Sequence, residues 1–410
     1  MTRVLVHVWL DGRDVKAANL YTAFRRGRLT SVFGYEPDYL AGAGAYALDP
    51  SLPLTPGSWP SPGTLPRALL DAAPDRWGRG LIAKREAAAA REAGRAPRTL
   101  DDSDFLLGAA DATRQGALRF ALTPGGAFQH PEPQVPRLVE LPGLLRAADL
   151  AARDGAESEA AAKALLGAGT GSLGGARPKA AVRDGSRLLI AKFPHAADHW
   201  DVMAWEVVAL DLARSAGIAT PDTRLVDVGG ASVLLSTRFD RLGAARLGYI
   251  SALTVAAADD AAQTDYLRLA QALATVSAEP SRDLADLWRR IALSVALHNT
   301  DDHLRNMGLL HVRGGWRLAP AFDLNPDPAG GTARATPLGG AATTADTAAA
   351  LVEHAGEFGL SAGEARRQTA QVATAVAGWE RAATARGLDR PARERFRPVF
   401  EAGVAALNGA

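Results

Sequence analysis

Two β-hairpin patterns with one amphipathic segment between them occupy the middle of this chain. Residues 179–193 and 225–239 each consist of two β-type runs on either side of a short glycine turn, which is a strong hairpin signal. Residues 198–215 place apolar side chains at three- and four-residue spacing, and Gly217 stands where a left-handed helix cap belongs. The sequence therefore predicts a hairpin, a helix and a second hairpin, in that order.

Strands are expected before this central region and helices after it. Val4–Leu10 and Arg28–Tyr35 are β-branched and aromatic runs that indicate a small sheet near the N-terminus. Beyond residue 251 the pattern is mainly helical, with a clear amphipathic segment at Ser281–His298. The Ala/Gly/Thr-rich stretch Asp327–Thr347 is the one segment with the composition of a mobile loop.

Further helices are expected before the central hairpins and near the end of the chain. The pattern is helical over Pro74–Ala93, with Gly94 as a stop, and again over Leu141–Leu166. Near the end, Ser361 and Glu364 have the spacing of a capping box, which predicts a helix running toward Arg386.

Composition excludes several classes of protein. The chain has 410 residues and no cysteine, so disulfides, a zinc site with Cys ligands and a thiol nucleophile are ruled out. Its 46 basic and 45 acidic residues nearly balance, so the chain lacks the large net positive charge of a free-standing nucleic-acid binder. We find neither a signal-peptide pattern nor an apolar run of about 18 residues that would cross a bilayer, and therefore expect a cytoplasmic protein without membrane contact.

An acidic run follows the amphipathic segment at Ser281–His298. It reads Asn-Thr-Asp-Asp-His-Leu-Arg-Asn and places Asn306 five residues after Asp301. Protein kinases use the same interval, because the Asp faces the substrate hydroxyl while the Asn reaches magnesium from the same loop. An Asp pair at a helix end can also be a solvated turn. His303 can either be a structural histidine or approach nucleotide phosphates.

A second carboxylate follows this run. Two short β-type runs, Met307–Val312 and Trp316–Ala319, surround a Gly-Gly turn and lead to Asp323. The hairpin returns the chain toward the acidic run, and a metal ion allows neighbouring carboxylates to remain ionised. We therefore expect Asp323 to be the principal magnesium ligand, with Asn306 as the second and Asp301 as the catalytic base of a phosphoryl transfer.

A lysine and a glycine-rich segment complete the predicted chemistry. Lys192 lies among apolar neighbours at the end of a predicted strand, where its charge must be compensated, and Glu206 lies beside the apolar stripe of the next helix. A Lys192–Glu206 ion pair with the lysine on ATP phosphates would satisfy both residues. Residues 169–174 match a G-x-G-x-x-G pattern, which is weak by itself and is either a flap over phosphates or a flexible linker.

Five segments, in order, resemble the HipA family of serine/threonine protein kinases, the toxins of type II HipBA-like toxin–antitoxin systems. They read SLGGARPK from Ser172, AKFP from Ala191, TRFDR from Thr237, TDDHLRN from Thr300 and AFDLNP from Ala321. The upstream stretches PDRWGR from Pro74 and GALRF from Gly116 are also similar to the family's N-terminal region.

The resemblance implies an α+β, protein-kinase-like two-lobed fold behind a small α/β N-terminal domain. With a breaker-rich stretch of four prolines at Thr123–Pro136 as the first boundary, we expect an N-terminal domain at 1–135, a small lobe at 136–245 and a helical large lobe at 246–410.

The resemblance also implies roles for individual residues. Asp301 would be the base, Asn306 and Asp323 the Mg²⁺ ligands and Lys192 the phosphate contact, while Ser172 would be an autophosphorylation site whose phosphate silences the enzyme. The remaining implied ATP contacts are Ser172, Gly174, Gly175, Ala176, Thr237, Phe239, Asp240 and His303. Two positions depart from the expected pattern: Asp302 stands where the best-known relative has a glycine, and Thr237 stands where the family usually has an acidic hinge residue.

The implied substrate is a translation-related protein such as an aminoacyl-tRNA synthetase. The implied partner is a HipB-like helix-turn-helix antitoxin, through which the chain would reach DNA only indirectly. Two other functions stay open. A small-molecule phosphotransferase of the aminoglycoside type uses the same Asp–Asn interval, and a non-catalytic module could act by holding the antitoxin on DNA.

Overall fold

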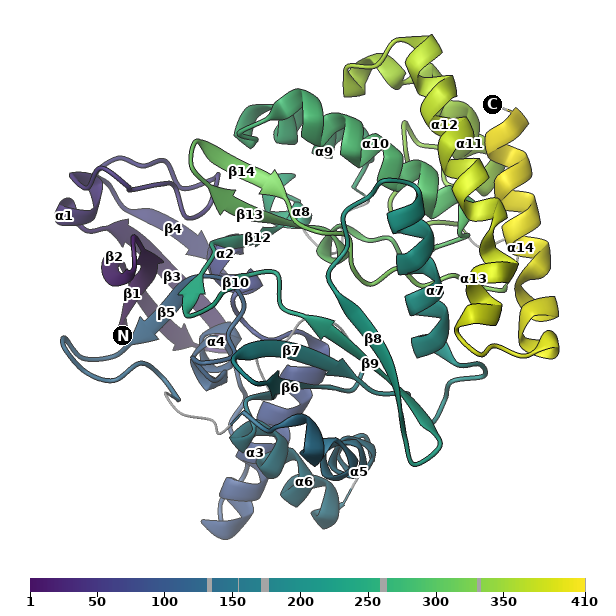
Figure 1. Ribbon diagram of the computed structural model, residues 1–410. Helices are drawn as coiled ribbons and strands as arrows, with labels where there is room; N and C mark the ends of the chain where they lie inside the picture. The colour runs from purple at the N-terminus through teal and green to yellow at the C-terminus, as the bar shows by residue number, and fades with distance from the viewer. Residues whose placement is uncertain (131–134, 154, 171–176, 259–263, 330–332, 410) are drawn as a thin grey trace. The chain divides into compact units, whose positions relative to one another are not determined.

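The computed structural model describes residues 1–130, 135–153, 155–170, 177–258, 264–329 and 333–409 (Figure 1). They form two compact units. Unit 1 is Met1–Ala197 with Val226–Ile250, and unit 2 is Asp198–Leu225 with Ser251–Ala410. The predicted boundaries after residues 135 and 245 stay predictions. Within the described ranges, no helix is long and apolar enough to cross a membrane.

Unit 1 begins with an antiparallel sheet in the order β4-β3-β2-β1-β5. Its strands are β1 (Thr2–Leu10), β2 (Arg13–Arg25), β3 (Arg28–Tyr35), β4 (Trp59–Pro62) and β5 (Leu118–Ala121). Asp11 and Gly12 join β1 to β2 with φ of 48° and 80°, as a two-residue hairpin turn with the right-handed strand twist requires. The predicted strands β1 and β3 are confirmed, whereas β2, the longest of the five, was not predicted.

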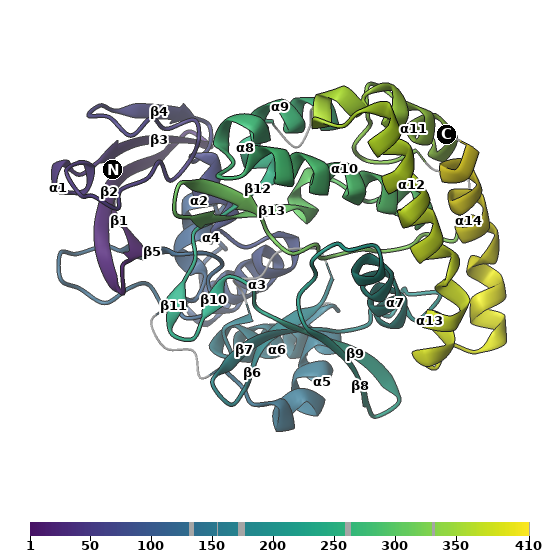
Figure 2. The same ribbon diagram turned by 45° about the horizontal axis from the view of Figure 1, so that its top comes forward.

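The second sheet of unit 1 has the order β6-β7-β9-β8. The two predicted hairpins are confirmed as β6 (Lys179–Asp184) with β7 (Arg187–Lys192), and β8 (Thr223–Val228) with β9 (Ala231–Thr237). Side chains of α5 (Leu141–Ala151) and α6 (Ala156–Gly167) share a core with Ala180, Val182, Leu189 and Ala191 of this sheet. Figure 2 shows the ribbons of these two helices next to β6 and β7. One face of the β6–β7 hairpin is therefore covered by helices.

The remaining elements of unit 1 are short, apart from α3. The predicted helix at 74–93 is observed as α3 (Arg76–Glu92), and the single pattern predicted over 141–166 is divided between α5 and α6. The others are α1 (Pro37–Leu40), α2 (Arg67–Asp71), α4 (Asp102–Gly108), η1 (Leu138–Glu140), β10 (Arg241–Leu242) and β11 (Ala245–Arg246). The chain passes into unit 2 within β12 (Tyr249–Ser251).

Unit 2 is mainly helical, as predicted. Its helices are α7 (Val202–Ser215), α8 (Ala252–Val255), α9 (Tyr266–Val276), α10 (Pro280–Ala296), α11 (Thr344–Glu353), α12 (Ala362–Ala377), α13 (Trp379–Ala385) and α14 (Arg390–Gly409), with η3 (Leu304–Asn306) and η4 (Ala355–Phe358). β13 (Gly308–Val312) and β14 (Gly315–Leu318) form the predicted hairpin.

Helix α10 is the centre of unit 2, and it contacts α9, α11, α12, α14 and β14 (Figures 1 and 2). Ser361 and Glu364 form the predicted capping box, but the helix they open ends at Ala377 instead of running toward Arg386. Gly378 separates α12 from α13 at this point. The break lets Trp379 stack on Phe400 of α14, with ring centroids 5.0 Å apart.

Candidate functional site

The end of α10 sets the position of the predicted catalytic residues. His298 follows the helix with a φ of 51°, and the backbone N–H groups of His298 and Asn299 donate to the carbonyls of Val295 and Ser294. These two bonds make a Schellman cap, in which a left-handed residue ends the helix and turns the chain away from its axis. Residues 299–306, called here the acidic loop, therefore leave α10 in a fixed direction.

Within the acidic loop, Asp301 is open to solvent and Asn306 is half-buried. The side chain of Asp301 is 72% exposed, and its Oδ1 lies 3.8 Å from Nε2 of His303. Nδ2 of Asn306 donates to the backbone carbonyl of Asp301 at 3.0 Å, and the backbone N–H of Asn306 donates to the carbonyl of His303 at 2.8 Å. The five-residue interval thus brings Asn306 back onto Asp301 while the Asp301 carboxylate stays accessible.

Asp323 is held by contacts of the residues before and after it. Arg290 of α10 donates through Nη2 to the carbonyl of Ala319 at 2.7 Å, and Ala321 N–H donates to the carbonyl of Ala219 at 2.7 Å. Asp323 has a φ of 58°, a left-handed conformation that is uncommon for a residue other than glycine. Nδ2 of Asn325 donates to the Asp323 carbonyl at 3.3 Å. Such strained backbone is found preferentially at functional sites.

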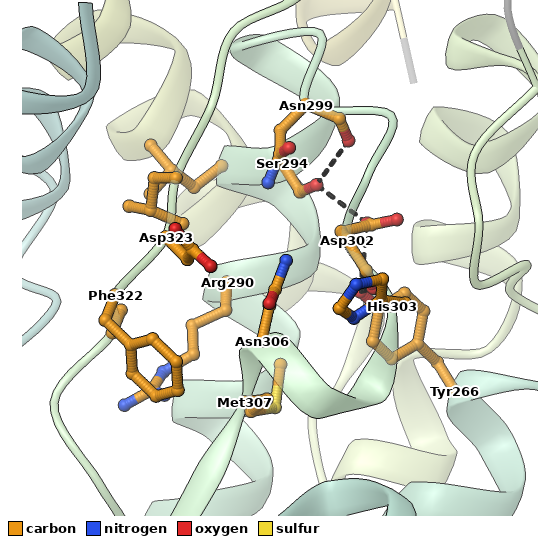
Figure 3. Close-up of a pocket in the computed structure, with 13 residues that line it drawn as sticks. Tyr266, Arg290, Ser294, Asn299, Asp302, His303, Asn306, Met307, Phe322 and Asp323 are labelled. Carbon is orange, nitrogen blue, oxygen red and sulfur yellow. Dashed lines mark hydrogen bonds between the residues drawn. The ribbon is translucent and has the colours of Figure 1, made fainter. Parts of the chain in front are cut away.

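Asp323 and Asn306 line the same pocket. The pocket is partly open to solvent, and its walls come from α9, α10, the acidic loop, Met307 and residues 321–324. Figure 3 shows the side chains of Asp323 and Asn306 entering this space from different segments, with His303 and Asp302 on the acidic-loop side. A carboxylate and an amide oxygen that converge in this way are suitable Mg²⁺ ligands.

Asp302 also lines the pocket, and it was not predicted as a site residue. It is buried, and its Oδ2 accepts hydrogen bonds from Ser294 Oγ at 2.7 Å and Tyr266 OH at 2.9 Å. Arg334 Nη2 lies 3.4 Å from the same oxygen. Burial raises the pKa of the Asp302 carboxyl above its usual value, although Arg334, Ser294 and Tyr266 favour the charged form. The only sequence signal that marked Asp302 was its difference from the glycine of the best-known relative.

In unit 1, Lys192 has a lysine directly opposite it. The register of the β6–β7 hairpin pairs Lys179 with Lys192, and both side chains are buried, at 4% and 8% exposure. Because Ala180 and Ala191 belong to the core under the sheet, alternation places both lysines on the other face. Lys179 was not predicted as a site residue, although it is the first residue of the predicted strand.

The predicted hinge segment follows β9. Thr237 pairs with Leu189, and Phe239 lies against Tyr249 with ring centroids 6.4 Å apart. Asp240 is buried. Its carboxylate accepts hydrogen bonds from Nε and Nη2 of Arg238, Nη1 of Arg241 and the backbone N–H of Gly116. Burial by itself would raise the pKa of Asp240, but the charges of Arg238 and Arg241 bring it well below its usual range.

Four predicted ATP contacts, Ser172, Gly174, Gly175 and Ala176, lie outside the described residues. Glu206 is buried in α7. It belongs to unit 2 and Lys192 to unit 1, so their ion pair stays a prediction.

Comparison with known proteins gives the family. Residues 171–379, just over half of the chain, match the model of the HipA-like C-terminal domain. The chain belongs to this HipA-like family. Among curated proteins, none matches the chain in sequence.

A solved structure has a similar fold. HipA, in a complex described as the toxin–antitoxin system HipA, HipB and operator DNA of Shewanella oneidensis MR-1, matches with a TM-score of 0.70 and 16% identity. The match covers 99% of this chain and 97% of that one. The proinflammatory kinase CtkA of Helicobacter pylori matches only at a TM-score of 0.40, with 13% identity, over 56% of this chain and 93% of its own. The HipA match confirms the predicted fold class, a kinase-like fold with an N-terminal domain.

Proposed function

We propose that this HipA-like chain is an ATP- and Mg²⁺-dependent serine/threonine protein kinase of the toxin type. The observation that carries the proposal is the convergence of Asp323 and Asn306 in one pocket, with Asp301 beside them on the acidic loop. Phosphoryl transfer needs mainly such positioning and charge neutralisation. The 72% exposure of the Asp301 side chain favours a protein substrate, whose serine or threonine can reach it from solvent.

Asp301, Asn306 and Asp323 each have a role in this reaction. Asp301 accepts the proton of the attacking hydroxyl, whose oxygen forms a bond to the γ-phosphorus while the bond to the bridging oxygen of ADP breaks. Asn306 and Asp323 would hold Mg²⁺, which neutralises phosphate charge when bound. Within the described residues, no group of three or more His, Asp or Glu side chains could hold a metal alone. One carboxylate and one amide suit Mg²⁺, which keeps several waters and takes further ligands from phosphates.

Lys179 and Lys192 would supply positive charge that binds the phosphates of ATP. Lys179 and Lys192 lie directly opposite each other in the register of the β6–β7 hairpin, so both ammonium groups could contact the same bound polyphosphate. We propose Lys192 as the phosphate contact, with Glu206 as its partner, and His303 as a further contact to the phosphates.

The predicted hinge residues Thr237, Phe239 and Asp240 would bind the nucleoside part of ATP. Backbone groups of Thr237 and Phe239 would contact adenine. A contact from Asp240 to ribose would require ribose hydroxyls to replace some of the protein groups that now donate to its carboxylate.

A labelling experiment tests the proposed reaction and separates its alternatives. Purified protein is incubated with γ-labelled ATP, Mg²⁺ and a cell extract, and label is measured in the protein and the acid-soluble fractions. We expect protein-bound label that is lost in Asp301→Asn. Label found only in small molecules would support a small-molecule phosphotransferase, and no transfer at all would leave a non-catalytic binding module.

One regulatory proposal accompanies the kinase. Ser172 is proposed to be autophosphorylated, and phosphate there is expected to silence the enzyme by placing negative charge next to those of ATP. Mass spectrometry after incubation with ATP should find phosphate on Ser172 in the wild type and none in Asp301→Asn. A wild-type protein without phosphate at Ser172 would end this proposal and leave the kinase itself intact.

Partners are proposed from the family and the HipA match. Because the matching structure contains HipB and operator DNA, we propose a HipB-like antitoxin as partner, DNA contact through that antitoxin, and a cytoplasmic setting. The protein substrate is proposed to be translation-related, such as an aminoacyl-tRNA synthetase. Phosphoproteomes of cells expressing the wild type or Asp301→Asn should differ at the substrate, and identical profiles would contradict a toxin kinase.

A further inference from the structure

A segment downstream of Asp323 is bonded to the acidic loop on both sides of Asp301. The backbone N–H of Ala335 donates to the carbonyl of Thr300 at 2.8 Å, and Thr336 Oγ1 donates to the carbonyl of Asp302 at 3.0 Å. Nη2 of Arg334 donates to the carbonyl of Asn299 at 3.1 Å. Residues 334–337, called here the clamp segment, thus fix three of the backbone carbonyls that precede or follow the proposed base.

Side chains reinforce this backbone contact. Asp302 and Arg334 are both buried, 3.4 Å apart, and Ser294 Oγ lies between them: it accepts from Arg334 Nη2 at 2.9 Å and donates to Asp302 at 2.7 Å. Tyr266 of α9 donates through its hydroxyl to Asp302 and through its backbone N–H to the carbonyl of Pro337. The network therefore joins α9, α10, the acidic loop and the clamp segment.

The start of the acidic loop is also tied to the chain just after Asp323. Asp327 N–H donates to the carbonyl of His298 at 3.1 Å, and Thr300 Oγ1 donates to Asp327 Oδ2 at 3.3 Å. The loop that carries Asp301 and Asn306 is thus held at two places by the segment that carries Asp323. The distance between the proposed base and the proposed metal ligand depends on these bonds.

A buried ion pair is by itself weak support for stability, because desolvation offsets most of its Coulomb energy. The placement of this one is more informative, since the bonds described from the clamp segment to the acidic loop end on the carbonyls of Asn299, Thr300 and Asp302, close to Asp301 in the chain, and the ion pair ends on the Asp302 side chain. We propose that Arg334 and Thr336, acting with Asp302, are positioning residues that hold Asp301 in line for phosphoryl transfer. A misplacement of about 1 Å can cost about a hundredfold in rate. The inference rests on the proposed kinase activity.

The test compares Arg334→Met and Thr336→Val with the wild type. Thr336→Val keeps the side-chain shape and removes one hydrogen bond. Thr369→Val is the matched control, because Thr369 is also buried in unit 2 and donates at 2.8 Å to a backbone carbonyl, that of Ala365 within α12. Transfer of label from ATP is measured well below the melting temperature of each variant, and kcat and KM for ATP are determined separately.

We expect kcat to fall at least tenfold in Arg334→Met and about threefold or more in Thr336→Val, with KM for ATP within threefold of wild type in both. Thr369→Val should keep the wild-type kcat. A kcat within twofold of wild type in folded Thr336→Val and Arg334→Met overturns the inference while the kinase proposal stands. If Arg334→Met does not fold, Thr336→Val decides alone. A wild type that transfers no label removes the kinase proposal, and this inference with it.

Discussion

Replacing Asp240 by Asn should destabilise unit 1 strongly. The Asp240 carboxylate accepts hydrogen bonds at 2.7 Å from Arg238 Nε, 2.8 Å from Arg241 Nη1 and 2.7 Å from Gly116 N–H. Asn keeps the shape but removes the charge, which leaves two buried guanidinium groups uncompensated. Breaking a buried pair in this way costs about 3–5 kcal/mol. For a unit of roughly 220 residues this corresponds to a drop in melting temperature of about 6–20 °C.

Thermal and urea unfolding measure this effect, with Asp184→Asn as the control. Asp184 pairs with Arg187 at the surface of the same unit, and an exposed pair contributes at most about 1 kcal/mol. The pKa of Asp240 is lowered in the folded state, so its contribution is present above the unfolded pKa and is lost only as the pH falls through the folded one. The difference between wild type and Asp240→Asn should therefore stay constant from pH 8 to 5. A loss below 1 kcal/mol at pH 7 would refute the structural role of Asp240.

Three further outcomes are expected. Lys192→Met and Lys179→Met should each weaken ATP binding about tenfold in calorimetry, and unchanged affinity in both would contradict the role of the lysine pair. Burial lowers the pKa of His311 to about 4, so the unfolded state binds the proton more readily than the folded state. The free energy of unfolding should therefore fall by up to about 2 kcal/mol from pH 7 to 5, and its dependence on pH should be weaker in His311→Asn. In Gly403→Ala the new Cβ would lie 2.5 Å from the carbonyl oxygen of Ala296, so the free energy of unfolding should fall by about 1–3 kcal/mol. In the control Gly387→Ala the new Cβ meets no neighbour, so only the strain of its positive φ should lower the free energy of unfolding.

Local patterns in the sequence were sufficient for much of the fold. Glycine turns and alternating β-type runs identified the β6–β7, β8–β9 and β13–β14 hairpins, because turn chemistry and strand periodicity are local properties. The strand β2 was not predicted because its apolar residues, which include the adjacent pair Ala17 and Ala18, do not alternate strictly with polar ones, and its place is set by pairing with β1 and β3. The break at Gly378 was missed because the capping box marks only where α12 begins.

The candidate site was predictable where spacing within one segment decides it. The five-residue interval from Asp301 to Asn306 and the hairpin before Asp323 were visible in the sequence. The structure places Asn306 and Asp323 on the wall of one pocket, and their roles as Mg²⁺ ligands stay predictions. Asp302 and Arg334 could not be paired, because 32 residues separate them and only tertiary packing brings them together. The composition of Asp327–Thr347 predicted a mobile loop. Arg334, Thr336 and Leu338 within it are buried, which differs from that prediction.

The central claim is that Asn306 and Asp323 bind Mg²⁺ for ATP, and calorimetric titration of the protein with ATP tests it most directly. Each titration is run with Mg²⁺ and with a chelator, for the wild type, Asp323→Asn and the control Asp222→Asn, whose carboxylate is exposed elsewhere in unit 2. We predict that Mg²⁺ tightens ATP binding at least tenfold in the wild type and in Asp222→Asn, and that this gain disappears in Asp323→Asn. Equal affinity with and without Mg²⁺ in the wild type, or a full Mg²⁺ gain in Asp323→Asn, would contradict the claim.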